Sequence, residues 1–295
     1  MPTDVRPRRS MLYMPGSNAR ALEKARTLPA DALIFDLEDA VAPDAKTRAR
    51  ETIAAAVTEG GYGRRELIIR VNGLDTAWGA ADLAAVASLP VQGVLLPKVE
   101  AAAHIRQAAS LLDRAGAPES LALWCMMETP LGLLHAEEIA AASPRLGGFI
   151  MGTSDLAKDL HARHTRDRLP LLTGLSLCLL AARAYGLAVL DGVHLDLADD
   201  EGFAAACRQG LELGFDGKTL IHPKTIAAAN AIFAPDAAEI AWAEKLVAAF
   251  ETARAAGKGV VLVDGKLIET LHVVEARRLL TLAQDIAELS RDTPA

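Results

Sequence analysis

Eight short apolar runs, each followed by a polar residue or a proline, organise most of this 295-residue chain. The runs are Met11–Met14, Leu33–Leu37, Leu67–Val71, Val94–Leu96, Leu121–Met127, Phe149–Gly152, Ala188–Leu190 and Thr219–Ile221. The stretches between them are rich in alanine and carry apolar residues every three to four positions, as helices with one buried face do. The order reads strand–helix repeated eight times, which predicts a parallel (β/α)8 TIM barrel.

The predicted helices complete this repeat. They are Asn18–Thr27, Lys46–Thr58, Ala80–Ala87, Ala101–Ala115, Ala136–Ala142, Leu175–Tyr185, Glu201–Leu213 and Lys224–Phe233. One such barrel takes about 250 residues, so tens of residues remain for another element. We therefore predict a barrel domain over residues 1–234 and a C-terminal arm over residues 235–295.

The arm has the pattern helix–hairpin–helix. Asp236 and Glu239 have the spacing of a capping box and predict a helix start, and Gly257 ends that helix. A hairpin of Val260–Val263 and Lys266–Ile268 around Asp264-Gly265 follows, and then a helix from about His272 to Leu289. So thin an arm must pack against something, and we expect it to cover the barrel mouth of a neighbouring subunit.

Composition excludes several classes of protein. With 51% hydrophobic and 23% charged residues the chain is typical of a soluble globular enzyme, and its net charge of −7 disfavours nucleic acid as a partner. Cys125, Cys178 and Cys207 form neither a disulfide framework nor a CxxC metal site. Met1–Ser10 leads into too few apolar residues for a signal peptide, and Leu169–Ala182 is too short and polar to span a membrane. We expect a cytoplasmic protein.

Glu128 and Asp155 are the most informative polar residues. Each is expected at the end of one of two adjacent strands, five and six, so their carboxylates can converge at the rim where this fold places catalytic groups. Two carboxylates that leave room for water and substrate oxygens are a common Mg²⁺ site. The alternative is that each carboxylate caps a helix or pairs with an arginine, and we favour the metal.

Two cations stand near these carboxylates. Arg70 interrupts an apolar strand, where it would either stabilise a developing enolate or carboxylate, or pair with Glu38 or Asp39 as a structural residue. Lys98 ends strand four and raises the alternative of a Schiff-base aldolase. We give that alternative less weight, because metal carboxylates make a covalent electron sink unnecessary.

Several ordered motifs resemble one known family. They are Arg9-Ser-Met-Leu-Tyr-Met-Pro-Gly-Ser17, Asp36-Leu-Glu-Asp-Ala-Val-Ala-Pro43, Arg70-Val-Asn72, Pro97-Lys98, Glu128-Thr129, Asp216-Gly-Lys218 and Ile221-His-Pro223. From Arg9 to about Ala283 the chain resembles the citrate lyase β-subunit-like group of the HpcH/HpaI aldolase superfamily. The resemblance implies a Mg²⁺-dependent barrel, in which Mn²⁺ is expected to substitute, that acts on CoA thioesters and 2-oxo acids. It also implies a homotrimer or hexamer whose arm reaches the next subunit.

The resemblance assigns roles to residues of this chain. Glu128 and Asp155 would be the Mg²⁺ ligands and Arg70 the contact to the substrate carbonyl, with Glu38, Asp39 and Lys98 behind the metal. The positions implied to hold substrate or CoA are Tyr13, Asn18, Lys24, Arg70, Ser154, Ile221 and His222. Glu269 stands where many relatives carry the catalytic aspartate of the arm, and would be the acid/base in this chain.

Three functions remain to be weighed. Together with Met151-Gly-Thr-Ser-Asp-Leu-Ala-Lys158, these motifs look most like the malyl-CoA lyase and malyl-CoA thioesterase branch. The leading hypothesis is C–C cleavage of malyl-CoA, β-methylmalyl-CoA or citramalyl-CoA, which releases acetyl- or propionyl-CoA and a 2-oxo acid. The alternative is hydrolysis of malyl-CoA at the same site. A non-catalytic ligand sensor is disfavoured by the intact set of carboxylates.

Overall fold

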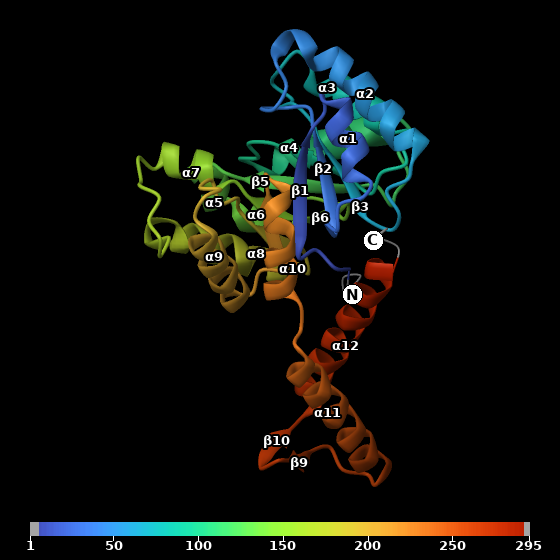
Figure 1. The fold of residues 1–295 in the computed structure, drawn as a ribbon, viewed down its shortest axis with the longest axis vertical. Coiled ribbons are helices and arrows are strands. Elements are labelled where there is room, and N and C mark those ends of the chain that lie inside the picture. The colour runs from blue at the N-terminus through green and yellow to red at the C-terminus, as the bar shows by residue number, and fades with distance from the viewer. Residues whose placement is uncertain (1–5, 292–295) are drawn as a thin grey trace. The chain divides into compact units, whose positions relative to one another are not determined.

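The barrel predicted from the eight apolar runs is confirmed by the structure, a computed structural model that describes residues 6–291 (Figure 1). Eight parallel strands pair in sequence order and close between the first and the last. They are β1 (Ser10–Pro15), β2 (Ala32–Asp36), β3 (Glu66–Arg70), β4 (Gly93–Leu96), β5 (Ala122–Met127), β6 (Leu146–Met151), β7 (Ala188–Asp191) and β8 (Gly217–Leu220).

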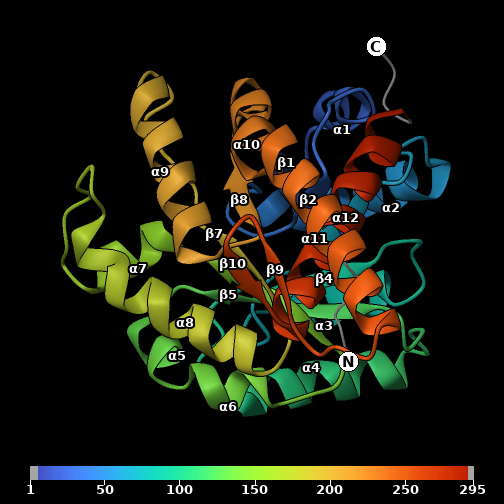
Figure 2. The ribbon, with the colours of Figure 1, turned by 90° about the horizontal axis from the view of Figure 1, so that it is seen from below.

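Helices surround the strands, as the view in Figure 2 shows. They are α1 (Ala19–Ala25), α2 (Lys46–Glu59), α3 (Gly79–Val86), α4 (Ala102–Arg114), α5 (Pro130–Leu134), α6 (Ala136–Ala140), α7 (Thr153–Asp159), α8 (Leu172–Ala184), α9 (Asp200–Leu213) and α10 (Ile226–Phe233). Short 3-10 turns, η1 (Pro43–Ala45), η2 (Leu169–Leu171) and η3 (Pro223–Thr225), precede α2, α8 and α10. No helix in residues 6–291 is long and apolar enough to cross a bilayer.

The helix prediction missed two helices. The predicted helix Ala136–Ala142 is present as α6, but a further short helix, α5, precedes it, because Thr129 caps a turn at Gly132. Helix α7 was missed altogether. Its first residues, Thr153 to Asp155, were expected at the polar end of strand six, but β6 ends at Met151. Asp155 therefore lies in the first turn of a helix and not at a strand end.

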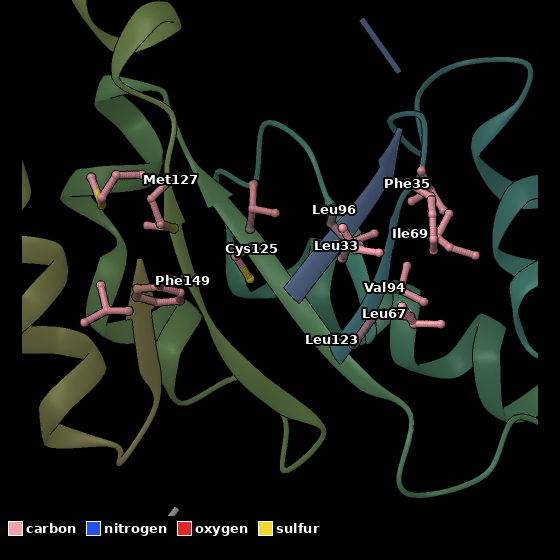
Figure 3. Packing of buried hydrophobic residues seen from close by; sticks show 14 of the residues in the cluster. Leu33, Phe35, Leu67, Ile69, Val94, Leu96, Leu123, Cys125, Met127 and Phe149 are labelled. Carbon is pink, nitrogen blue, oxygen red and sulfur yellow. The ribbon is translucent and has the colours of Figure 1, made fainter. Parts of the chain in front are cut away.

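Side chains alternate between two buried layers along the strands. One layer contains strand residues and helix residues, so it fills the space between the barrel and its helices; Figure 3 labels ten of its members. The other contains only strand residues: Met11, Ala32, Ile34, Ile68, Leu95, Trp124, Met126, Ile150, Ala188 and Leu190. Because a closed barrel has a single interior, this second layer is the inner core, and its register defines the inward positions of β1 to β7.

Residues 234–291 belong to a second compact unit, separate from the unit of Arg8–Phe233. It contains α11 (Ala237–Ala255), the antiparallel pair β9 (Val261–Val263) and β10 (Lys266–Ile268), and α12 (Thr270–Arg291). Asp236 and Glu239 form both hydrogen bonds of the capping box. A small apolar core that includes Phe250, Val263 and Ile268 joins the hairpin to the two helices.

Candidate active site

Near the carboxyl ends of the strands, polar residues occupy the positions that point into the barrel. Tyr13 in β1 packs against the inner core, Asp36 and Arg70 are the last residues of β2 and β3, and Glu128 lies two residues beyond the inner Met126 of β5. Of these four, Asp36 was not predicted from the sequence. Its signal is positional: it stands two residues after the inner Ile34, in the motif that supplied Glu38 and Asp39.

Arg70 is held by carboxylates on three sides. Its Nε and Nη2 donate to Asp36 at 2.7 and 2.6 Å, and its Nη1 lies 2.7 Å from Glu38 Oε2 and 3.6 Å from Asp39 Oδ2. Its guanidinium carbon lies 5.0 Å from the centre of the Tyr13 ring, within cation–π range. The structural partner expected for this arginine is therefore present, but Asp36 is its main partner, with Glu38 second.

Tyr13 is a neutral phenol in this setting. Burial raises its pKa, and this effect exceeds the opposite influence of the Arg70 charge. The hydroxyl donates to the Met126 sulfur at 3.3 Å, a weak acceptor. Tyr13 therefore keeps a hydroxyl available at the bottom of the site for a stronger acceptor.

Glu128 is buried and carries a strongly shifted pKa. Its Oε1 accepts the backbone N–H of Lys98 at 2.8 Å. Burial raises its pKa to about 7, an effect that the Lys98 hydrogen bond opposes and the charge of Glu38 reinforces. Gly152 leaves room for this carboxylate, because a Cβ at position 152 would lie 2.5 Å from Glu128 Oε2. Only glycine allows the two strands' ends to approach in this way.

Lys98 brings both its backbone and its side chain to the carboxylates. Its backbone has a left-handed conformation (φ 47°), which costs roughly 1–2 kcal/mol in a residue with a side chain. The ammonium lies 3.0 Å from Glu38 Oε1 and 3.8 Å from Asp155 Oδ2. Burial lowers the pKa of Lys98, but the Glu38 hydrogen bond and nearby carboxylates outweigh it and raise the pKa overall. A protonated ammonium is no nucleophile, which argues against the Schiff-base alternative.

A cavity of about 380 Å³ connects most of these groups. Of the predicted site residues it is lined by Tyr13, Asp39, Arg70, Glu128, Ser154, Asp155 and Ile221. The buried hydroxyl of Ser154 has no hydrogen-bond partner within the described part of the chain. Glu38 and Lys98 line an adjacent cavity of about 750 Å³, and Asp155 lines both.

Four predicted residues are not among those lining either cavity. Asn18 caps α1 by accepting the Ala21 N–H, Lys24 lies exposed in the same helix, and His222 caps η3 through its Nδ1. Glu269 belongs to the second unit, where it is exposed and its backbone N–H donates to His272. The family resemblance implied substrate or CoA contacts for the first three; in the structure Asn18 and His222 cap local helices and Lys24 faces solvent.

The donor set of the cavity suits a hard divalent cation. Within residues 6–291 no three His, Cys, Asp or Glu side chains form a ready metal cluster. The carboxylates Glu128 and Asp155 nevertheless line one cavity, and the pKa of Glu128 responds to the charge of Asp155. Two carboxylates with water and substrate oxygens fit Mg²⁺, and carboxylates outnumber cations in this region.

Comparisons with known proteins identify the family of this chain. Residues 9–223 match the family described as HpcH/HpaI aldolase/citrate lyase. The chain is 53% identical over 287 residues to a (3S)-malyl-CoA thioesterase of Cereibacter sphaeroides (strain KD131 / KCTC 12085), covering 97% of this chain and 98% of the relative. It is 34% identical to an L-malyl-CoA/beta-methylmalyl-CoA lyase of Cereibacter sphaeroides (strain ATCC 17025 / ATH 2.4.3), covering 97% and 98%.

A solved structure gives the same assignment. The protein CitE from Mycobacterium tuberculosis, in complex with magnesium, acetoacetate and coenzyme A, is 30% identical with a TM-score of 0.73, and the match covers 93% of this chain and 97% of that one. The family resemblance seen in the sequence motifs is thereby confirmed. The chain belongs to the HpcH/HpaI aldolase/citrate lyase family of enzymes.

Proposed function

We propose that this protein hydrolyses a malyl-CoA-type thioester in a Mg²⁺-dependent reaction. The observation that carries the proposal is the 53% identity to a (3S)-malyl-CoA thioesterase over 97% of the chain. The lyase relative is 34% identical over the same share. We therefore favour hydrolysis over C–C cleavage, which was the leading hypothesis from the sequence motifs.

Glu128 and Asp155 are the residues that would hold the metal, with the remaining positions left to water and substrate oxygens. Mg²⁺, or Mn²⁺ in its place, would supply a Lewis acid that polarises a bound oxygen. Glu38 and Asp39 would stand behind these ligands and orient water, and Lys98 would fix Glu128 through its backbone N–H. The magnesium in the Mycobacterium tuberculosis relative supports this assignment.

Arg70 and Tyr13 would act on the thioester itself. In hydrolysis water adds to the thioester carbonyl carbon, the C–S bond breaks, and the sulfur leaves as the CoA thiol once protonated. Negative charge develops on the carbonyl oxygen during the addition. Arg70 would stabilise that charge from a fixed position, because Asp36 holds two of its nitrogens, and the Tyr13 hydroxyl would add a second donor.

The CoA end of the substrate would lie along β1 and β8. These strands are paired, so the loops that follow them, which carry Asn18 and Ile221-His222, are neighbours in the barrel. Lys24, exposed in α1, would meet a CoA phosphate, and Ser154 would contact the acyl part inside the cavity. These residue assignments come from the family resemblance and are supported by this arrangement.

Glu269 in the arm would complete the site of a neighbouring subunit in a homotrimer or hexamer. A subunit mixture tests this. Glu269→Gln and Arg70→Ala proteins, each inactive, should regain part of the activity after mixing, because some mixed oligomers would contain one site with both residues intact. Mixed oligomers without any regained activity would show that Glu269 does not act in trans.

Product analysis decides between the two reactions. The protein is incubated with malyl-CoA and Mg²⁺, and free thiol, malate, glyoxylate and acetyl-CoA are quantified. Hydrolysis yields equal amounts of free CoA and malate without glyoxylate. Glyoxylate with acetyl-CoA and no free thiol would instead establish the lyase, which the lyase relative supports as the second candidate.

A further inference from the structure

A second buried ionic cluster lies in the outer register of the barrel, on the side of β7 and β8 that faces the helices. Asp191 ends β7, and its register partner in β8 is Lys218. Asp191 Oδ2 accepts from Lys218 Nζ at 2.8 Å and from Arg168 Nη1 at 2.5 Å. Asp191 and Lys218 are almost fully buried, and the Arg168 side chain is 11% exposed.

This cluster has one positive charge in excess. Burial alone would raise the pKa of Asp191, but Lys218 and Arg168 outweigh it and lower that pKa, so the carboxylate is ionised. One carboxylate oxygen is then shared by two cations. One carboxylate balances only one of these two cations, so the three side chains together keep one positive charge that an anion would offset.

Arg168 has the donors for such an anion. Its Nε and Nη2 are buried and have no hydrogen-bond partner among residues 6–291, since Asp191 takes only Nη1. Arg8, Arg9 and Arg70 each use this same Nε–Nη2 edge to hold the carboxylate of one acidic side chain. In Arg168, therefore, the edge of the guanidinium that can bind two oxygens at once has no hydrogen-bond acceptor among the described residues.

A cavity of about 310 Å³ adjoins the cluster. Arg168, Lys218 and His194 line it, and the buried Nε2 of His194 also lacks a partner in the residues that the structure describes. Two acidic residues, Asp199 and Asp196, also line it; Asp199 caps α9, Asp196 accepts from the Ala198 N–H, and both charges act on His194. Thr153 and Val193 belong to the walls of both this cavity and the candidate catalytic cavity.

We propose that this cavity is a binding site for a small oxyanion, a carboxylate or phosphate group, held by the Nε–Nη2 edge of Arg168 with His194 beside it. Its volume leaves space for a few further atoms of the ligand. Both nitrogens are covered in the structure, so the anion reaches them when the turn that carries Arg168 shifts. That turn has a left-handed backbone at Arg168 (φ 55°) and exposed neighbours on both sides.

His194 offers a local readout. Burial lowers its pKa, the positive charges of Lys218 and Arg168 lower it further, and Asp199 and Asp196 act in the opposite direction. An oxyanion bound to Arg168 would offset the two cations. It would therefore raise the pKa of His194 towards the ordinary value for histidine.

The test is an NMR titration of the histidine rings in the full-length protein, with EDTA present to keep metal out of the catalytic cavity. The His194 signal is assigned by its loss in His194→Gln. Inorganic phosphate and malonate are added separately, with potassium chloride at matched ionic strength as the control. We expect a saturable shift of the His194 signal and a rise in its pKa with at least one oxyanion, and the arm that responds identifies a phosphate or a carboxylate ligand.

Two variants and one crystal complete the test. Arg168→Lys keeps the charge beside Asp191 but loses the fork, and should bind the oxyanion at least roughly tenfold more weakly. Arg163→Met, an exposed arginine of the same loop that does not line the cavity, should bind as the parent does. A crystal grown with the responding anion should show it within hydrogen-bond distance of Arg168 Nε and Nη2. The proposal is overturned if neither oxyanion shifts His194, if chloride shifts it equally, if Arg168→Lys binds with unchanged affinity, or if the crystal shows only water there.

Discussion

The barrel wall carries an ionic cluster on each face. The outer cluster is buried, the inner cluster is partly exposed, and the two are opposite in sign. In the inner cluster the carboxylates of Asp36, Glu38, Glu128 and Asp155 surround Arg70 and Lys98. In the outer cluster Arg168 and Lys218 share Asp191. Because buried charges must be compensated, the sign of each imbalance indicates the missing ligand: a cation inside the barrel mouth and an anion behind the wall.

Burial is the first cause of the pKa shift in each cluster, and the neighbouring charges reinforce it. Burial raises the pKa of Glu128 to about 7 with help from the charge of Glu38, and burial lowers the pKa of His194 with help from Lys218 and Arg168. In both clusters a carboxylate also lies close to a glycine, where a Cβ would crowd it. A Cβ would lie 2.5 Å from Glu128 at Gly152 and 3.1 Å from Asp191 at Gly210. The two sites therefore share a construction and differ in charge.

The largest expected effect is on the inner cluster. Glu128→Ala and Asp155→Ala should each lower turnover at least about a hundredfold, because even the partners of metal ligands are worth 10–100-fold in affinity or activity. Circular dichroism should show the fold unchanged, and Mn²⁺ binding followed by paramagnetic resonance should be lost. Full activity in EDTA, or substrate trapped on Lys98 by borohydride, would contradict the cation site and restore the Schiff-base mechanism.

Substitution of Arg70 should lower activity nearly as much, and the shape of the guanidinium should matter more than its charge. Its three guanidinium nitrogens contact Asp36 and Glu38 together, which a lysine ammonium cannot do. We expect Arg70→Lys to lower kcat/KM roughly tenfold or more, close to the effect of Arg70→Ala, as steady-state kinetics would show. If the lysine variant keeps most of the activity, Arg70 is only the counter-ion of the inner carboxylates.

The fold could be predicted from the sequence because apolar runs and helical spacing are local patterns. The eight runs located every strand of the barrel, and the capping pair Asp236 and Glu239 located α11. Helix α7 was missed because Gly152-Thr153-Ser154 carries no apolar periodicity. Its N-terminal turn forms where the chain leaves the barrel, which is a tertiary constraint.

The sites were predictable only where a motif marked them. Glu128 and Asp155 were predicted from the sequence and line the cavity, but the binding of Arg70 by Asp36 depends on the register between β2 and β3, which spacing does not reveal. The role of the Lys98 backbone depends on a left-handed φ. Nothing in the sequence singled out Arg168, because its partner Asp191 is 23 residues away and its free edge is visible only in three dimensions.

A smaller effect should appear in the pH dependence of stability of the metal-free protein. The folded pKa of Glu128, about 7, lies above the ordinary value of 4.5, so the folded state binds more protons between these values. The contribution of Glu128 to the free energy of unfolding is therefore fully present below about pH 4.5 and is lost as pH rises towards 7. Glu128→Gln should remove this loss and gain up to about 3 kcal/mol at pH 8, since each tenfold change in a protonation equilibrium is worth about 1.4 kcal/mol. Denaturant unfolding in EDTA measures this free energy as a function of pH. If the profiles of Glu128→Gln and the parent protein are the same, the pKa of Glu128 is not raised in the folded state.

The smallest effect belongs to the outer cluster and has the opposite sign. The folded pKa of His194 is lowered, so the unfolded state binds more protons and stability falls as pH drops through about 6.5, the ordinary value. His194→Gln should remove a loss of under about 1 kcal/mol between pH 7.5 and 5.5, because the side chain is only partly buried. Phosphate or malonate should remove the same loss in the parent protein, since a bound anion restores the charge balance around the imidazole. An anion that changes the profile of His194→Gln as much as that of the parent would place the effect elsewhere in the chain and end the parallel between the two clusters.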